Sequence, residues 1–229
     1  AYGPTPLEKL DILSPPSGAD DKPAVVYMHG GGWFAGARAA NHAVLSEVAS
    51  AGRLVFNLSY PLAPQARHPQ PLIALLGALR WIAEQHPSIA ARGLHLIGDS
   101  AGGNLAVMLA ALSADSRLLS IVPEVDFAIP PVRSVVSLYG VLDRLSWVED
   151  GFFGATQMLM AYAGQGAFAP EVPPELAITP MDLEIENLPP IFVAVGDRDS
   201  LQRSSQMFAD AMRARGITVQ HKVYDGAGH

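Results

Sequence analysis

The sequence predicts an α/β fold in which a mostly parallel central sheet is flanked by helices. Short apolar runs with β-branched residues alternate with longer stretches of helical periodicity, a pattern typical of parallel strands joined by crossover helices. The length of 229 residues suits one large α/β domain better than two small ones. No repeat, low-complexity tract or linker divides the chain, so we expect a single domain over residues 1–229.

The apolar runs and helical stretches follow one another in a regular order. The predicted strands are Leu7–Leu13, Ala24–Met28, Leu54–Leu58, Leu94–Ile97, Val135–Leu138, Ile191–Val195 and Thr218–Tyr224. The predicted helices are Asn41–Ala51, Leu72–Gln85, Ala101–Leu112 and Gln202–Arg215. Asn41 and Ser100 are residue types that suit helix N-termini, and Gly216 suits a helix stop.

One irregular stretch, residues 143–190, interrupts this alternation. It carries an apolar helical pattern that stops at Gly164, followed by a proline-rich segment from Pro170 to Pro180. We expect a small cap-like insertion that lies over the carboxyl ends of the strands, where ligands bind in open α/β sheets. The apolar stretch Leu118–Pro131, with Glu124 and Asp126 inside it, has no role that the sequence assigns.

Composition excludes several classes of function. With 15 basic and 22 acidic side chains, the net charge of −7 argues against a nucleic-acid binder and against a polybasic membrane anchor. The absence of cysteine excludes disulfides, thiolate catalysis and zinc–thiolate sites. The histidines are scattered without an H-E-x-x-H pattern, so we expect neither a metal nor an organic cofactor. No signal peptide is visible, and we expect a cytoplasmic protein.

The segment LHLIGDSAGGNLA, Leu94–Ala106, contains the strongest chemical signal. It reads as a strand, then G-D-S-A-G, then a helix, which is the context of a nucleophile elbow. Such an elbow holds its serine in a strained turn, with small flanking residues that leave room for the chain to reverse. Ser100 is therefore the predicted nucleophile. The alternative is an ordinary strand-to-helix turn in which Ser100 only caps the helix.

A serine hydroxyl needs a base to accept its proton and an acid to orient that base. In α/β-hydrolase order both follow the nucleophile, which leaves His221 and His229 among the seven histidines. His221 lies within a predicted strand, whereas His229 follows the turn YDGAG, so His229 is the predicted base. The candidate acids are Asp197 and Asp199, in the turn after Ile191–Val195, and Asp143.

These motifs resemble those of the hormone-sensitive-lipase-like family of α/β-hydrolase esterases. The resemblance spans nearly the whole chain and rests on HGGGW at His29–Trp33, YPLAP at Tyr60–Pro64, GDSAGGNLA at Gly98–Ala106, GDRDSL at Gly196–Leu201 and the terminal GAGH. It implies the α/β-hydrolase fold with a small cap, and it selects Asp199 as the acid. Pro61 and Gln65 depart from the family's tyrosine motif, and we expect these departures to affect the substrate range more than the chemistry. A helix that normally follows the histidine in such folds is not part of this sequence.

The resemblance also assigns a function to the three-glycine run. It implies that the N–H groups of Gly31, Gly32 and Ala101 form an oxyanion hole, which stabilises the negative charge that develops when the serine attacks a carbonyl. His29 and Trp33 are expected to fix the shape of this loop, and Trp33 and Phe34 to wall the acyl side. Phe152 and Phe153 of the insertion are further candidates for substrate binding.

We therefore expect a serine carboxylesterase that hydrolyses short-chain acyl esters through an acyl-enzyme. The alternatives are an aryl formamidase or carbohydrate acetyl esterase on the same triad, or a ligand-binding module that kept the fold and lost turnover, as the gibberellin receptors resembling this family have done. The expected partner is a small-molecule ester, with no nucleic acid and no membrane anchor. The sequence does not determine the oligomeric state and leaves a homodimer open.

Overall fold

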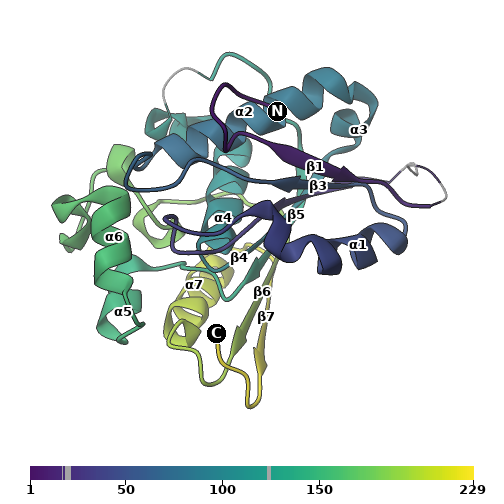
Figure 1. Ribbon diagram of the computed structural model, residues 1–229. Coiled ribbons are helices and arrows are strands. Elements are labelled where there is room, and N and C mark those ends of the chain that lie inside the picture. The colour runs from purple at the N-terminus through teal and green to yellow at the C-terminus, as the bar shows by residue number, and fades with distance from the viewer. Residues whose placement is uncertain (17, 19–21, 123–124) are drawn as a thin grey trace.

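A seven-stranded sheet forms the centre of the computed structural model, which describes residues 1–16, 18, 22–122 and 125–229 (Figure 1). The strands lie in the order β1-β3-β2-β4-β5-β6-β7. β1 runs antiparallel to β3, and the other neighbouring pairs are parallel, as the alternating pattern of the sequence predicted. The strands are β1 (Leu10–Leu13), β2 (Ala24–Met28), β3 (Val55–Leu58), β4 (Leu94–Asp99), β5 (Val132–Leu138), β6 (Ile191–Gly196) and β7 (Val219–Tyr224).

Helices cover both faces of the sheet. α1 (His42–Ser50) packs on one face, where Leu45 contributes to the same small apolar cluster as Val25. α2 (Gln70–Gln85), α4 (Ala101–Ala114) and α7 (Gln202–Ala214) contribute side chains to one large buried cluster that also contains Val26. Because successive strand residues point to opposite faces, Val25 and Val26 lie in different clusters. α4 is buried over most of its length, since it packs against β2, β4 and β5.

Some predicted boundaries and elements differ from the structure. The first strand begins at Leu10 and not at Leu7, and two short helices were not predicted: α3 (Pro87–Arg92) and α5 (Arg144–Glu149). Each has six residues, which is too short for a helical period to stand out from the sequence. Asn41 and Ser100 precede α1 and α4 as expected, but neither side chain caps its helix by a hydrogen bond.

The stretch 143–190 folds as a run of short helices beside the sheet (Figure 1). It contains α5, α6 (Ala155–Ala163) and the 3₁₀ turns η3 (Gln165–Phe168), η4 (Pro174–Leu176) and η5 (Pro180–Asp182). A buried ion pair holds its two ends together, with Arg144 Nε 2.9 Å from Asp182 Oδ1. Arg144 also donates to the carbonyl oxygens of Ala167 and Ala169, so one side chain joins α5, η3 and η5.

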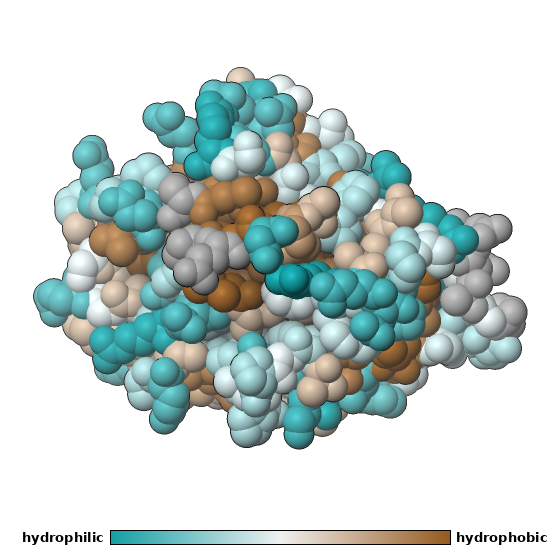
Figure 2. All heavy atoms as spheres, turned by 90° about the horizontal axis from the view of Figure 1, so that it is seen from above, coloured by the Kyte–Doolittle hydropathy of each residue, from teal (hydrophilic) through white to brown (hydrophobic). Residues whose placement is uncertain are grey.

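Of the stretch 118–131, Val122 and residues 125–127 line a pocket together with α2, and Figure 2 shows apolar side chains gathered on this face of the molecule. Asp126 forms an ion pair with Arg80 at 2.8 Å, and the Arg80 guanidinium lies 5.8 Å from the ring of Phe127. Glu124 lies outside the described residues. In the part of the chain that the structure describes, no helix is both long and apolar enough to cross a membrane.

Candidate active site

The carboxyl ends of the parallel strands bring the predicted site residues to one edge of the sheet. The glycine loop follows β2, Ser100 follows β4, Asp199 lies in the turn after β6, and His229 comes five residues after the end of β7. These strands are neighbours or near neighbours in the sheet. Segments far apart in the sequence therefore meet at a single place, as is typical of ligand sites in open α/β sheets.

Ser100 occupies a strained turn between β4 and α4. Its φ of 50° and ψ of −120° are unusual for a residue with a side chain, and such outliers concentrate at functional sites. Its N–H donates to the carbonyl of Leu138 at 2.8 Å, which ties the turn to β5. The turn needs glycine at Gly98 and Gly102, because a Cβ at either position would collide with backbone atoms. Ser100 does not use its side chain as a helix cap, and its Oγ lies 3.1 Å from His229 Nε2.

His229 lies between Ser100 and a buried carboxylate. Its Nδ1 is 2.8 Å from Asp199 Oδ2, and Asp199 Oδ1 accepts a hydrogen bond from the Leu201 N–H at 2.9 Å. Asp199 is only 5% exposed, so its hydrogen bonds are shielded from water and its position is well defined. With Nδ1 protonated toward the carboxylate, Nε2 is left as an acceptor for the Ser100 hydroxyl proton.

The alternative candidates for the acid and the base contact other residues or lie elsewhere in the fold. Asp143 caps α5 by accepting from the Ser146 N–H at 2.8 Å. Asp197 accepts from the Gly226 N–H at 2.8 Å and so anchors the loop that carries His229. His221 lies on β7, away from these contacts. Among the described residues, no group of three or more histidine, aspartate or glutamate side chains could hold a metal ion.

The glycine loop turns tightly beside the serine. Gly31 and Gly32 have φ values of 115° and 60°, which side chains disfavour, and the Gly31 carbonyl accepts from the N–H groups of Phe34 and Ala35. Within the described hydrogen bonds, the N–H groups of Gly31 and Gly32 have no acceptor. Ala101 begins α4, so its N–H has no acceptor inside the helix. These donors are therefore available to an oxygen that carries negative charge.

Asp99, which precedes the serine, holds the elbow and the glycine loop together. Its Oδ1 accepts from the Gly30 N–H at 2.9 Å and from the Tyr27 hydroxyl at 2.5 Å. Burial and the nearby Asp99 carboxylate raise the pKa of the Tyr27 hydroxyl, which stays protonated as a donor. The sequence analysis did not identify this contact, although Asp99 lies within the serine motif and Tyr27 stands two residues before the glycine motif.

His29 and Tyr60 support the same loop from behind. The two rings stack with centroids 4.5 Å apart, and the Tyr60 hydroxyl donates to the His29 carbonyl at 2.7 Å. The imidazole Nδ1 of His29 lies 2.7 Å from the Gly30 carbonyl, and burial lowers the pKa of His29. A neutral His29 therefore fixes the shape of the loop, as the sequence analysis expected.

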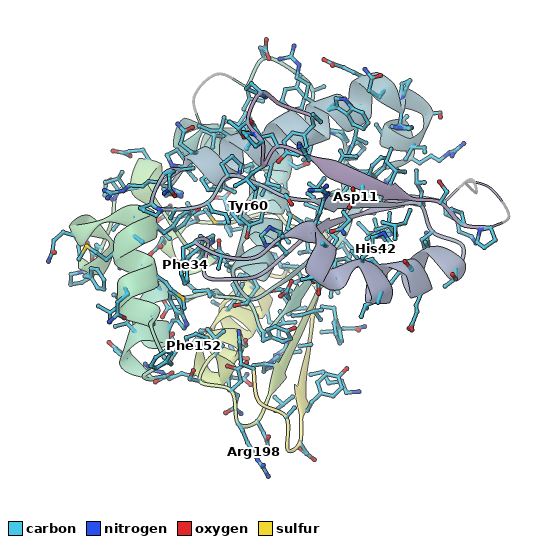
Figure 3. All side chains as sticks on the ribbon, in the orientation of Figure 1. Asp11, Phe34, His42, Tyr60, Phe152 and Arg198 are labelled. Atoms are coloured by element: carbon cyan, nitrogen blue, oxygen red, sulfur yellow. The ribbon has the colours of Figure 1, made fainter. Side chains whose placement is uncertain are left out.

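The aromatic residues predicted to bind substrate occupy different environments. Trp33 is fully buried and stacks on Tyr162, with centroids 4.4 Å apart, so it supports the loop and does not line a pocket. Phe34 and Phe153 are exposed and line an apolar pocket of about 520 Å³. Phe152 is not among the residues lining that pocket; its ring packs against His229. Figure 3 shows Phe34 and Phe152 on the side of the sheet that faces α5 and α6.

Comparison with known proteins gives a consistent set of similarities. A family model described as alpha/beta hydrolase fold matches residues 25–229. The chain is 26% identical to a carboxylesterase, NlhH, of Mycobacterium tuberculosis over 226 residues, covering 91% of this chain and 66% of that protein. It is 30% identical to an ethyl acetate hydrolase of Pseudomonas putida over 210 residues, covering 90% of this chain and 65% of that protein.

Solved structures of esterases superpose on this chain over almost its whole length. Esterase B from Lactobacillus rhamnosis superposes with a TM-score of 0.82 at 25% identity, covering 98% of this chain and 72% of that one. An esterase of the bacterial hormone-sensitive lipase family superposes with a TM-score of 0.76 at 25% identity, covering 96% and 75%. The chain spans about two thirds of the length of the two curated relatives named above.

Proposed function

The chain belongs to the α/β-hydrolase fold family, and on that premise we propose that it is a serine carboxylesterase that hydrolyses short-chain acyl esters. The observation that carries the proposal is the chain of hydrogen-bonding distances from Ser100 through His229 to Asp199, 3.1 Å and 2.8 Å. Relatives named as a carboxylesterase and an ethyl acetate hydrolase support the same reaction class.

The first half of the reaction forms an acyl-enzyme. Ser100 Oγ attacks the ester carbonyl while His229 Nε2 takes its proton, and Asp199 stabilises the imidazolium that forms. The C–O bond to the alcohol then breaks. His229 gives the proton to the departing alkoxide oxygen, so the alcohol leaves neutral and Ser100 carries the acyl group.

The second half returns the enzyme to its starting state. His229 takes a proton from water, whose oxygen attacks the acyl carbon, and the bond to Ser100 Oγ breaks as the same proton returns to the serine. The products are one carboxylic acid and one alcohol. The proposed reaction uses protein groups and water alone.

We assign the N–H groups of Gly31, Gly32 and Ala101 to the oxyanion hole. This assignment is supported by the closeness of the glycine loop to the serine, since a Cβ on Gly30 would lie 3.1 Å from Ser100 Cβ. Hydrogen bonds from rigid backbone donors act on the transition state more than on the ester. The N-terminus of α4 adds a favourable field at the same place.

We assign the pocket lined by Phe34 and Phe153 to the apolar part of the substrate. Met158 forms the part of its wall next to the glycine loop, since a Cβ on Gly32 would collide with the Met158 sulfur. We treat residues 143–190 as a cap-like insertion within one domain. A mostly apolar lining next to the loop favours an uncharged acyl group over charged substrates, and a relative named ethyl acetate hydrolase supports short acyl groups, acetyl to butyryl.

Hydrolysis of p-nitrophenyl acetate, butyrate and octanoate by the chain and its Ser100→Ala variant tests the proposal. We expect Ser100-dependent release of p-nitrophenol that falls as the acyl chain lengthens. Labelling of Ser100 by a fluorophosphonate, which needs an activated serine but no hydrolysis of the adduct, gives a second readout. The absence of both Ser100-dependent hydrolysis and labelling would refute the assignment.

A further inference from the structure

A continuous series of aromatic contacts joins His229 to the glycine loop through the insertion. The Phe152 ring lies 4.8 Å from the His229 ring, Trp147 lies 5.6 Å from Phe152, and Trp33 lies 5.6 Å from Trp147, measured between centroids. We call His229, Phe152, Trp147 and Trp33 the ring chain. Its ends are the proposed base and the residue that follows Gly32, so it connects two parts of the proposed site by side-chain packing alone.

The loop that carries His229 is tied to the turn after β6. The loop is anchored earlier, where Arg198 N–H donates to the Ala227 carbonyl at 3.0 Å and Gly226 binds Asp197. The imidazole itself contacts Asp199 and Ser100 through its two ring nitrogens. The two hydrogen bonds of the ring lie near its plane, so they restrain tilting out of that plane less than sliding within it.

Two aromatic rings pack directly against the imidazole and limit the space into which it can turn. Phe152 meets the imidazole at an interplanar angle of 80°, and Tyr139 meets it at 69° with centroids 4.9 Å apart. Tyr139 has a φ of 39°, an uncommon value for a residue with a side chain. It follows Leu138, whose carbonyl holds the Ser100 N–H, so its backbone is tied to the nucleophile. Phe152 comes from the insertion and has no such tie.

We propose that Phe152 is a positioning residue that holds the His229 imidazole in line with Ser100 and so couples the insertion to the base. The inference rests on the proposed function, and it replaces the expectation that Phe152 binds substrate. Trp147 is 1% exposed and packs against both Phe152 and Trp33. One buried tryptophan therefore supports the base on one side and the glycine loop on the other.

Buried and surface ion pairs hold the insertion in place. Arg144, three residues before Trp147, is 1% exposed and binds Asp182, Ala167 and Ala169. On the outer side, Arg203 of α7 binds Glu149 and Asp150 of the segment leading to Phe152. Phe152 is thus held between two anchored segments, and its ring can transmit their position to the imidazole.

The test compares Phe152→Ala and Phe152→Tyr in the full chain with p-nitrophenyl acetate. We expect Phe152→Ala to lower kcat by about 10- to 100-fold with KM changed by less than about twofold, because a misplaced base slows the reaction without weakening substrate binding. Phe152→Tyr keeps the ring and should restore most of kcat. Leu159→Ala is the control: it removes a fully buried side chain of α6 outside the ring chain, and should lower the melting temperature while leaving kcat within about threefold.

A double-mutant cycle with His229→Ala identifies the partner. If Phe152 acts through the imidazole, adding Phe152→Ala to His229→Ala should change the residual rate by less than about twofold. An equal loss in both backgrounds would overturn the proposal, and so would a rise in KM at constant kcat, which would make Phe152 part of the substrate wall.

A readout without turnover separates this inference from the proposed function. The proton on His229 Nδ1 that faces Asp199 should give a downfield NMR signal in the parent chain, and we expect Phe152→Ala to broaden or remove it through exchange with water. Absence of both ester hydrolysis and fluorophosphonate labelling in the parent chain would refute the proposed function, and the NMR comparison would still decide the positioning role. A signal that is equally sharp in both proteins would overturn that role.

Discussion

Replacing Asp182 by alanine should destabilise the protein strongly, because Asp182 neutralises a buried arginine. Arg144 and Asp182 side chains are 1% and 8% exposed, and their charged atoms lie 2.9 Å apart. Removing one partner of such a pair costs about 3–5 kcal/mol, since it leaves an uncompensated charge in the interior. The other carboxylate oxygen of Asp182 accepts from Ile178 and from the N–H and hydroxyl of Thr179, so these donors lose their partner as well.

Urea unfolding and calorimetry measure this loss directly. At about 2–4 °C per kcal/mol for a chain of this size, the melting temperature should fall by about 6–20 °C. Arg203→Ala, which breaks ion pairs at the exposed surface, is the control and should cost about 0–1 kcal/mol. Arg144→Met combined with Asp182→Asn removes both charges and should cost less than Asp182→Ala alone. A loss below about 1 kcal/mol for Asp182→Ala would refute the account of Arg144 as a buried charge that depends on this carboxylate.

Three further predictions concern catalysis and pH. Asp199→Asn should lower kcat by about 10⁴-fold with little effect on KM, because an amide in this place selects the wrong tautomer of His229. Steady-state kinetics measures this effect, and a loss of kcat under about tenfold would contradict the role of Asp199. Gly31→Ala should lower kcat by about 10²- to 10³-fold, because a Cβ there collides with the Ala35 carbonyl and turns the N–H donors away from the oxyanion. The control Gly77→Ala, whose Cβ lies in open space on α2, should leave kcat unchanged. Equal activity of the two variants would argue against the oxyanion assignment. Burial lowers the pKa of His68 to about 4, so the unfolded chain takes up a proton at a higher pH than the folded chain does. The free energy of unfolding should therefore decrease as the pH falls from about 6.5 toward 4, and His68 accounts for at most about 3 kcal/mol of this decrease. Urea midpoints of the parent chain and His68→Gln at pH 7 and pH 4 measure this contribution, and an identical pH dependence in both would count against it.

The predictions from sequence succeeded where the signal is local. A strand, a glycine-flanked serine and an apolar helix follow one another within Leu94–Ala106, and the structure has β4, the strained turn and α4 at those residues. Chain order then limited the base to His221 or His229. The short helices α3 and α5 escaped detection because six residues contain fewer than two turns of periodicity.

The predictions fell short where a residue's role depends on contacts between distant segments. Trp33 was expected to wall the substrate, but the insertion covers it completely. Phe152 and Phe153 look equivalent in the sequence, yet one packs against His229 and the other is 95% exposed. A difference of one position rotates a side chain to another face, and only the folded chain decides what that face meets.

The sequence by itself determined the α/β class, the elbow and the set of residues from which the proposed triad is drawn, because strand periodicity, glycine spacing and chain order are properties of neighbouring residues. The family resemblance had already selected Asp199 among the candidate acids. The tertiary structure alone decided how Asp99 joins the elbow to the glycine loop and that Phe152 touches the base. Phe152 and His229 are 77 positions apart in the sequence, and Gly30 and Asp99 are 69 positions apart. These contacts form when the sheet aligns the ends of its strands and the insertion packs over them. The pattern of neighbouring residues in the sequence does not predict such packing.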